Sequence, residues 1–226
     1  MKRIVRLLKK HFLSWIDYIV PMHQKKIITA GKKLEAASKA LIMLHGRGAS
    51  AEDILGLSTH LAVSDFALLA PQATGNTWYP FSFLEAPVKN EPWLTSALSL
   101  VGEAVEEAKA GGIALQNIYF LGFSQGACLT LEYVARNATR YGGVVAFTGG
   151  LIGDRIYDEN YKGNFGGAPV FIGSSNPDPH VPVERIKSSS AVLRKMHAAV
   201  TEKIYDQMGH TISQDEINQA NTLIFK

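Results

Sequence analysis

The sequence predicts an α/β fold, in which a mostly parallel central sheet carries helices on both faces. Short apolar runs alternate with longer segments of helical periodicity along most of the chain. Several of these runs are continuously apolar, which is typical of strands buried on both faces. The chain has 226 residues, 46% of them hydrophobic and 19% charged. This length and composition fit one globular domain with a substantial core.

The expected strands are short runs bounded by polar, glycine or proline residues. In chain order they are Ala40–Leu44, Phe66–Ala70, Ile118–Leu121, Val144–Phe147, Val170–Ile172 and Glu202–Tyr205, with Ile27–Gly31 as an added edge strand. Pro71 ends the second of the six, because proline has no N–H to donate to a neighbouring strand.

The expected helices lie between these strands. They are Ala51–Ala62, Leu94–Ala110, Gln125–Asn137, Val183–Ala198 and Gln214–Phe225. Glu52 and Asp53 suit the positive end of the first helix, and Gly111 stops the second. Ligands of open α/β sheets bind beyond the carboxyl ends of the strands, so the loops there are expected to carry the chemistry.

Residues 1–21 are expected to form a basic extension that precedes a domain spanning residues 22–226. The extension has five basic residues and one acidic residue, Asp17. As a helix it would be amphipathic, so residues 1–20 could contact an anionic membrane surface. Two alternatives are packing on the domain and a true start at Met22. Asp17 interrupts the apolar run, which argues against a secretory signal.

Charge and cysteine content exclude several classes of protein. The whole chain has 23 basic and 20 acidic residues, so residues 22–226 have 18 basic and 19 acidic. This near-neutral domain gives no basis for a nucleic-acid partner. Cys128 is the single cysteine, which precludes an internal disulfide and agrees with a cytoplasmic location. No cluster has zinc-ligand spacing, so no metal is expected, and no apolar run is long enough for a spanning helix.

The strongest local signal is the segment Gly122-Phe123-Ser124-Gln125-Gly126. It stands between an expected strand and an expected helix. In this context a sharp turn exposes the serine as a nucleophile, and the helix N-terminus favours a developing oxyanion. The alternative is a glycine-rich turn that only packs a helix on a strand. The context favours the nucleophile.

A nucleophilic serine needs a base and an orienting acid, expected in the order serine, acid, histidine. His210 follows the last expected strand and is the preferred base. His180 is a weaker candidate, and His197 lies within a helical pattern. Asp178 is the preferred acid, because flanking prolines stiffen its loop. Asp206 is expected to be an ordinary exposed charge.

Two backbone N–H groups are expected to stabilise the oxyanion. One belongs to Gln125, which follows the nucleophile, and the other to Arg47 in the loop His45-Gly46-Arg47-Gly48. The Arg47 side chain could attract an anionic group of a substrate or could remain solvated at the rim of the cleft.

The pocket residues expected around the serine are Trp78, Phe123 and His180. Trp78 belongs to an aromatic segment after the second strand, which could line an apolar pocket or form a local cap. Cys128 is expected to be buried by packing.

The chain resembles the phospholipase/carboxylesterase family of α/β-hydrolases, which includes the acyl-protein thioesterases. The matching pieces are LHGRGAS (44–50), APQATGNTWYP (70–80), GFSQGA (122–127), DPHVP (178–182) and MGHTI (208–212). The HGRG form is more similar to the bacterial carboxylesterase branch. One departure is Asn176, which stands where bacterial relatives often have an acidic residue. Residues 1–21 have no recognised counterpart.

The resemblance implies an α/β-hydrolase catalytic domain with Ser124, Asp178 and His210 as its triad, Gln125 and Arg47 as oxyanion donors, and no cofactor. The implied activity is hydrolysis of small carboxylic esters with short to medium acyl chains through an acyl-enzyme. Alternatives are an acyl-protein thioesterase, a membrane-associated lysophospholipase and, less favoured, a non-catalytic binding module on the same scaffold. Related enzymes often form homodimers.

Overall fold

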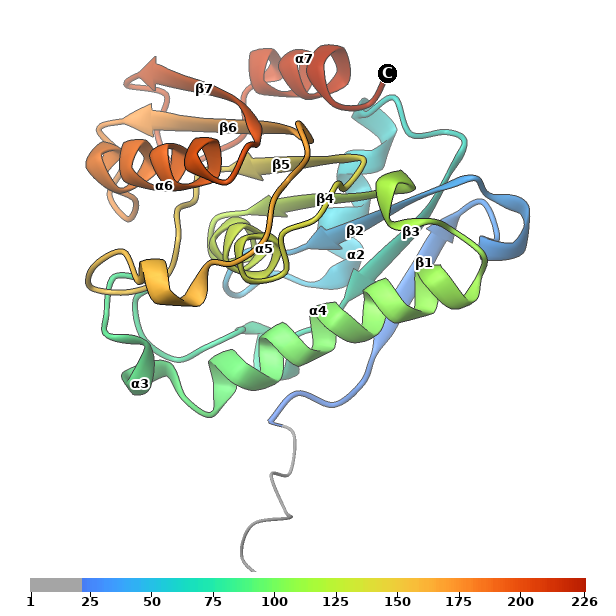
Figure 1. Cartoon of the computed structure of the whole chain (residues 1–226), viewed down its shortest axis with the longest axis horizontal. Helices are drawn as coiled ribbons and strands as arrows, with labels where there is room; N and C mark the ends of the chain where they lie inside the picture. The colour runs from blue at the N-terminus through green and yellow to red at the C-terminus, as the bar shows by residue number, and fades with distance from the viewer. Residues whose placement is uncertain (1–21) are drawn as a thin grey trace, which may run out of the picture.

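A seven-stranded sheet forms the centre of the molecule (Figure 1). The structure is a computed structural model that describes residues 22–226. Predictions made for residues 1–21, including membrane contact, lie outside the described residues. The strands are β1 (Ile27–Gly31), β2 (Lys39–Leu44), β3 (Phe66–Pro71), β4 (Ile118–Phe123), β5 (Gly143–Phe147), β6 (Pro169–Asn176) and β7 (Ala199–Asp206).

The sheet has the strand order β1-β3-β2-β4-β5-β6-β7. β1 pairs with β3 in antiparallel fashion, and all other neighbours are parallel. The predicted mostly parallel sheet is therefore confirmed, with Ile27–Gly31 as its edge strand. β3, β4 and β5 are buried along nearly their whole length, because helices cover both faces.

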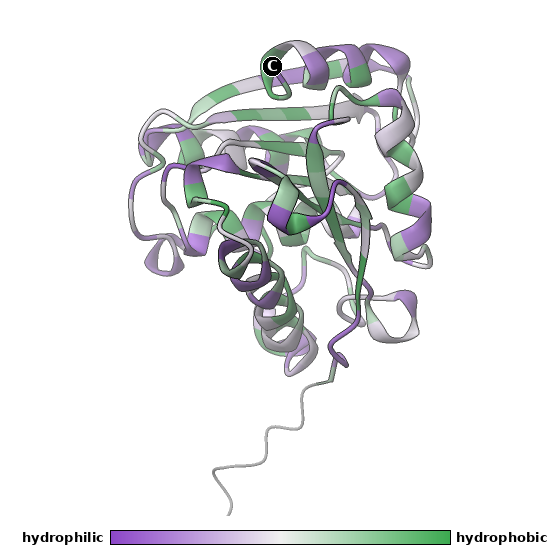
Figure 2. Ribbon diagram, turned by 90° about the vertical axis from the view of Figure 1, so that its right-hand side faces the viewer, coloured by the Kyte–Doolittle hydropathy of each residue, from purple (hydrophilic) through white to green (hydrophobic). Residues whose placement is uncertain are grey.

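Helices lie on both faces of the sheet, as predicted. Their bounds are α2 (Ala51–Gly56), α3 (Pro87–Asn90), α4 (Trp93–Ala110), α5 (Gln125–Arg136), α6 (Val183–Lys195) and α7 (Gln214–Leu223). One hydrophobic core lies between the sheet and α4, α5 and α6, and a second lies between the sheet and α2 and α7. Figure 2 shows the hydrophobic colour concentrated in the central strands, whereas the surrounding helices carry hydrophilic segments.

Two predicted helices end at least three residues earlier than expected. The first becomes a 3-10 helix, Leu57–His60, after Gly56. The other, α6, ends at Lys195, and His197 adopts a left-handed backbone with φ of 64°. The N–H groups of His197 and Ala198 donate to the carbonyls of Arg194 and Leu193, which is a Schellman termination. Periodicity did not reveal this stop, because it lacks the usual glycine.

The carboxyl ends of the parallel strands meet at one edge of the sheet. Every site residue that the sequence predicts lies at this edge, either in the loops that follow β2, β3, β4, β6 and β7 or, for Phe123 and Gln125, at the end of β4 and the start of α5. No helix within residues 22–226 is both long and apolar enough to cross a membrane.

Candidate active site

Ser124 occupies a strained turn between β4 and α5. Its φ of 54° and ψ of −118° are rarely adopted by residues other than glycine. The N–H of Ser124 donates to the carbonyl of Phe147 at 2.9 Å, which anchors the turn to β5. The hydroxyl therefore projects from the edge of the sheet at the N-terminus of a 12-residue helix.

The glycines that flank Ser124 allow this turn to pack tightly. A Cβ on Gly122 would collide with the backbone of Gly126, and a Cβ on Gly126 would collide with the carbonyl oxygens of Leu44 and His45. Their lack of a side chain brings the start of α5 directly against the ends of β4 and β2.

Two short hydrogen bonds connect Ser124 to residues far away in the sequence. His210 Nε2 lies 2.8 Å from the Ser124 hydroxyl oxygen. Its Nδ1 lies 2.8 Å from Asp178 Oδ2. The structure thus brings together the three residues that the sequence singled out as nucleophile, base and acid. It does so from three different loops.

The Asp178 carboxylate is fully buried and has a hydrogen bond to each oxygen. Its Oδ1 accepts the N–H groups of His180 and Val181, both at 2.9 Å. Burial by itself would raise the pKa of Asp178. The hydrogen bonds from His180, His210 and Val181 outweigh burial and lower this pKa below its ordinary value. Asp178 is therefore ionised near neutral pH and can stabilise a positively charged imidazole.

The loops that carry the acid and the histidine are joined to each other. Gly209 donates its N–H to the Ser175 hydroxyl at 3.0 Å, and Gln207 donates to the Asn176 carbonyl at 3.0 Å. The Ser175 hydroxyl in turn donates to the Pro177 carbonyl at 3.1 Å. These contacts fix the spacing of Asp178 and His210. The sequence around Ser175 and Gly209 gave no indication of them.

The two backbone groups expected to meet an oxyanion are available. Within residues 22–226, the N–H groups of Gln125 and Arg47 have no hydrogen-bond acceptor. Both residues line the same pocket as Ser124. Donors left free at a helix N-terminus and in a glycine-containing loop suit a developing negative charge.

The side chains of these two residues have a role that the sequence did not predict. The Gln125 amide accepts the Trp78 N–H at 3.0 Å and donates to the Tyr79 carbonyl at 2.8 Å. The Arg47 guanidinium donates to the Pro80 and Phe81 carbonyls at 2.9 and 2.8 Å. Both side chains attach the loop after β3 to the rest of the site. Arg47 is also exposed, as in the solvated alternative, but its guanidinium is held by these hydrogen bonds.

Trp78 corrects the sequence-based prediction of the pocket. It is fully buried and does not line the pocket. Its indole N–H donates to the His45 carbonyl at 2.8 Å, and its ring packs near the rings of His45 and His23. Trp78 therefore packs beneath the loop after β3, in the core rather than in the pocket. This agrees with the alternative of a local cap. An aromatic residue after a strand carries no sequence signal for the side of the loop on which it lies.

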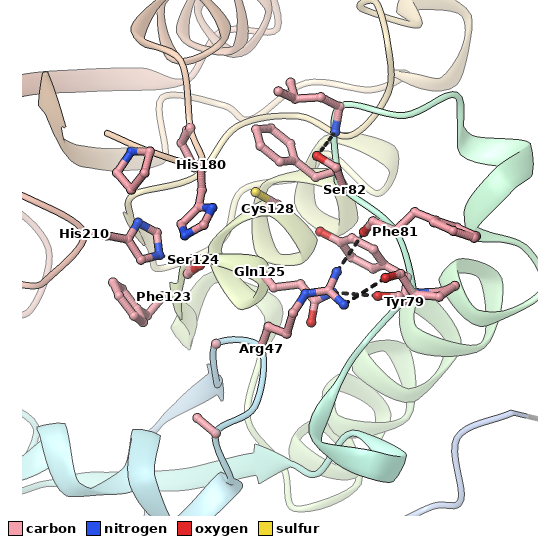
Figure 3. A pocket seen from close by; sticks show the side chains of 17 residues that line it. Arg47, Tyr79, Phe81, Ser82, Phe123, Ser124, Gln125, Cys128, His180 and His210 are labelled. Carbon is pink, nitrogen blue, oxygen red and sulfur yellow. Dashed lines mark hydrogen bonds between the residues drawn. The ribbon is translucent and has the colours of Figure 1, made fainter. Parts of the chain in front are cut away.

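The pocket above Ser124 has a volume of about 650 Å³ and mostly apolar walls. Phe123 and His180 line it, in agreement with where the sequence placed them. The His180 ring meets the His210 ring edge to face, with centroids 4.8 Å apart. Figure 3 shows His210 on one side of Ser124 and Arg47 and Tyr79 on the other.

Within the described part of the chain, no group of three or more His, Cys, Asp or Glu residues could hold a metal ion.

Comparison with known proteins supplies the family. The family model described as phospholipase/carboxylesterase matches residues 23–226, which is nearly all of the chain. The chain belongs to the phospholipase/carboxylesterase family. It is an ester hydrolase with the α/β-hydrolase fold, as the resemblance implied.

Several known proteins are similar to this chain, and two of them match over nearly their whole length. A phospholipase/carboxylesterase from Dyadobacter fermentans has 54% sequence identity and a TM-score of 0.90, and the match covers 91% of this chain and 98% of that one. Acyl-protein thioesterase 1 of Eremothecium gossypii is 26% identical over 87% of this chain and 91% of its own. The match to a probable carboxylesterase SOBER1-like protein of Arabidopsis thaliana, 28% identical, spans 57% of this chain and 49% of that protein.

Proposed function

We propose that Ser124, His210 and Asp178 form a catalytic triad that hydrolyses carboxylic esters through an acyl-enzyme. The observation that supports this proposal is the chain of two 2.8 Å hydrogen bonds from Asp178 through His210 to Ser124. Ser124 lies at the N-terminus of α5, in a backbone conformation that exposes its hydroxyl.

In the first half of the reaction, the Ser124 oxygen attacks the ester carbonyl carbon while His210 Nε2 takes the hydroxyl proton. Asp178 accepts the Nδ1–H bond and stabilises the imidazolium. The N–H groups of Gln125 and Arg47 donate to the oxyanion. The bond to the leaving oxygen then breaks, and His210 gives its proton to that oxygen. An acyl group remains on Ser124.

In the second half, a water molecule attacks the acyl carbon and His210 takes one of its protons. The same backbone donors stabilise the second oxyanion. The bond between the acyl carbon and the Ser124 oxygen breaks, and His210 returns the proton to Ser124. The products are an alcohol and a carboxylic acid, and the free enzyme is restored.

The pocket favours esters with short to medium acyl chains as substrates. Its volume of about 650 Å³ is partly open and mostly apolar, and it accommodates a small organic group. Thioester hydrolysis is a second candidate, supported by the similarity to proteins named acyl-protein thioesterase 1. Sulfur would then leave in place of oxygen. Comparing kcat/KM for matched oxygen and sulfur esters distinguishes the two.

Replacement of Ser124 tests the proposed nucleophile. We expect Ser124→Ala to reduce kcat for p-nitrophenyl butyrate by at least about 10⁴-fold, because no other group forms the acyl-enzyme. A fluorophosphonate probe should label Ser124 in the unmodified protein. Ser188→Ala, which changes an exposed serine on α6, is the control and should retain activity. Unchanged hydrolysis by Ser124→Ala, or labelling of another serine, would refute the assignment.

A further inference from the structure

The pocket has a polar inner end that the proposed mechanism does not use. Phe81, with 55% of its surface exposed, lies at the mouth. Tyr79 and Cys128, each 1% exposed, form part of the inner wall. Phe83 and Val181 add apolar surface to the same pocket. A phenol and a thiol are therefore part of the buried wall of a mostly apolar cavity.

The Tyr79 hydroxyl is a buried polar group with unused hydrogen-bonding capacity. Apart from the weak interaction with the neighbouring Cys128 thiol, it has no hydrogen-bond partner within residues 22–226. The Cys128 thiol, a weak hydrogen-bonding group, lies beside it, and Figure 3 shows the Tyr79 ring extending toward Cys128. Buried hydroxyls without a partner are uncommon, because desolvation costs free energy that only a hydrogen bond recovers. A ligand in the pocket could supply that bond.

The backbone of Tyr79 is fixed by hydrogen bonds to its carbonyl. The Tyr79 carbonyl accepts a hydrogen bond from the Gln125 amide at 2.8 Å and one from the Thr77 hydroxyl at 3.2 Å. These bonds fix the backbone from which the ring extends, and they do not use the hydroxyl. Burial raises the pKa of Tyr79 well above its ordinary value and raises the pKa of Cys128 to about 12. Both groups are protonated near neutral pH and can donate to an uncharged oxygen.

The site also sets where such an oxygen would lie along a substrate. The leaving group must be close to His210 Nε2, which protonates it, so the acyl chain extends to the other side of Ser124, toward Tyr79 (Figure 3). Cys128 follows Ser124 by one helical turn, and its N–H donates to the Ser124 carbonyl at 3.0 Å. Side chains one turn apart are separated by about 5–6 Å. The third or fourth atom of an acyl chain, counted with the ester carbonyl carbon as the first, spans this distance together with one hydrogen bond.

We propose that the Tyr79 hydroxyl, assisted by the Cys128 thiol, is a specificity determinant that favours esters with an oxygen at the third or fourth atom of the acyl chain. This inference rests on the proposed ester hydrolysis and adds a substrate class to it: oxygen-containing acyl groups rather than plain alkyl chains. A buried donor that is left unpaired by an alkyl chain and paired by an oxygen discriminates between the two.

Three isosteric esters and one isosteric substitution test the inference. The esters are p-nitrophenyl pentanoate, 2-ethoxyacetate and 3-methoxypropanoate, in which the second and third carry an ether oxygen at chain atoms three and four. We expect Tyr79→Phe to lower the ratio of kcat/KM for at least one ether ester to kcat/KM for the pentanoate by about three- to tenfold. Differences in intrinsic reactivity cancel when the ratios of the two proteins are compared.

Tyr119→Phe is the matched control, because it removes a hydroxyl from β4 in the core on the opposite face of the sheet. Its ratios should equal those of the unmodified protein. A purely structural effect of Tyr79→Phe would change all three esters equally. Ether-to-alkyl ratios that do not change in Tyr79→Phe would overturn the inference while leaving the proposed function intact. Absence of turnover of every ester would instead refute the proposed function, and this inference with it.

Discussion

At the scale of single residues, Asp178 shows how neighbours define what a carboxylate can do. Its two oxygens accept three hydrogen bonds, two from backbone N–H groups and one from His210. Asp206 lies at the end of β7 and is exposed, as predicted. The two aspartates differ in their surroundings rather than in their chemistry, so only Asp178 can fix the orientation of the histidine.

Exchange of Asp178 for its amide tests this difference. We expect Asp178→Asn to lower kcat for a p-nitrophenyl ester by about 10⁴-fold, because the neutral amide neither stabilises the imidazolium nor fixes its tautomer. Steady-state kinetics of the purified variant measure the loss. Asp206→Asn should leave kcat within about twofold. Equal effects of the two substitutions would contradict the role proposed for Asp178.

At the scale of secondary-structure elements, the site depends on how closely α5 approaches the strands. The turn at Ser124 is compatible with the sheet only because Gly122 and Gly126 leave no side chain between backbones. The Gln125 and Arg47 side chains then attach the loop after β3 to this unit. The same two residues thus offer free N–H groups to the pocket and bind its wall with their side chains.

A methyl group at the contact between α5 and β2 measures how tightly these elements are packed. We expect Gly126→Ala to destabilise the protein by about 1–3 kcal/mol, because its Cβ would meet the Leu44 and His45 carbonyls. Gly56→Ala is the matched control. Gly56 has helical backbone angles and open space around a Cβ, so this change should stabilise by about 0.5–1 kcal/mol. Thermal denaturation of both variants measures these changes in stability. An unchanged Tm in Gly126→Ala would show that the contact between α5 and β2 is loose.

At the scale of the whole molecule, two buried histidines join distant parts of the chain around Trp78. His23 Nδ1 accepts the Thr74 N–H at 3.1 Å, and its Nε2–H donates to the Trp78 carbonyl at 2.9 Å. His45 Nε2 accepts the Ala73 N–H at 3.1 Å. Each ring uses one nitrogen as an acceptor, so each is neutral in the folded protein. Burial lowers the pKa of both imidazoles below the ordinary value of 6.5.

These histidines predict loss of stability in mild acid. Because the folded-state pKa values are lowered, the unfolded chain binds protons more readily, and the contribution to stability is complete only above pH 6.5. It decreases as the pH falls from that value through the folded-state pKa. We expect the Tm to fall between pH 7.5 and 5.5, and to fall less in His23→Gln. His60→Gln, a change at an exposed histidine, should keep the original slope. Identical slopes in both variants would contradict this explanation.

Much of the fold follows from local patterns. The seven strands, the longer helices and their order were predictable, because burial on both faces and helical periodicity produce recognisable patterns over 5–18 neighbouring residues. The errors lie at element ends, as at His197, where hydrogen bonds rather than periodicity stop the helix. The four-residue helix α3 was also missed, because one turn is too short to show a periodicity. The strand-turn-helix context of Ser124 was equally local, and it allowed the nucleophile to be proposed.

The sequence by itself determined the type of fold, the family and a short set of candidate residues. Only the tertiary structure decided which of those residues meet. Ser124 and His210 are 86 positions apart, and they are hydrogen-bonded because β4 and β7 end at the same edge of the sheet. The structure likewise placed Trp78 in the core and Tyr79 in the pocket. Neighbouring aromatic residues carry the same local signal, and only the packing of the surrounding elements determines which of them a substrate can reach.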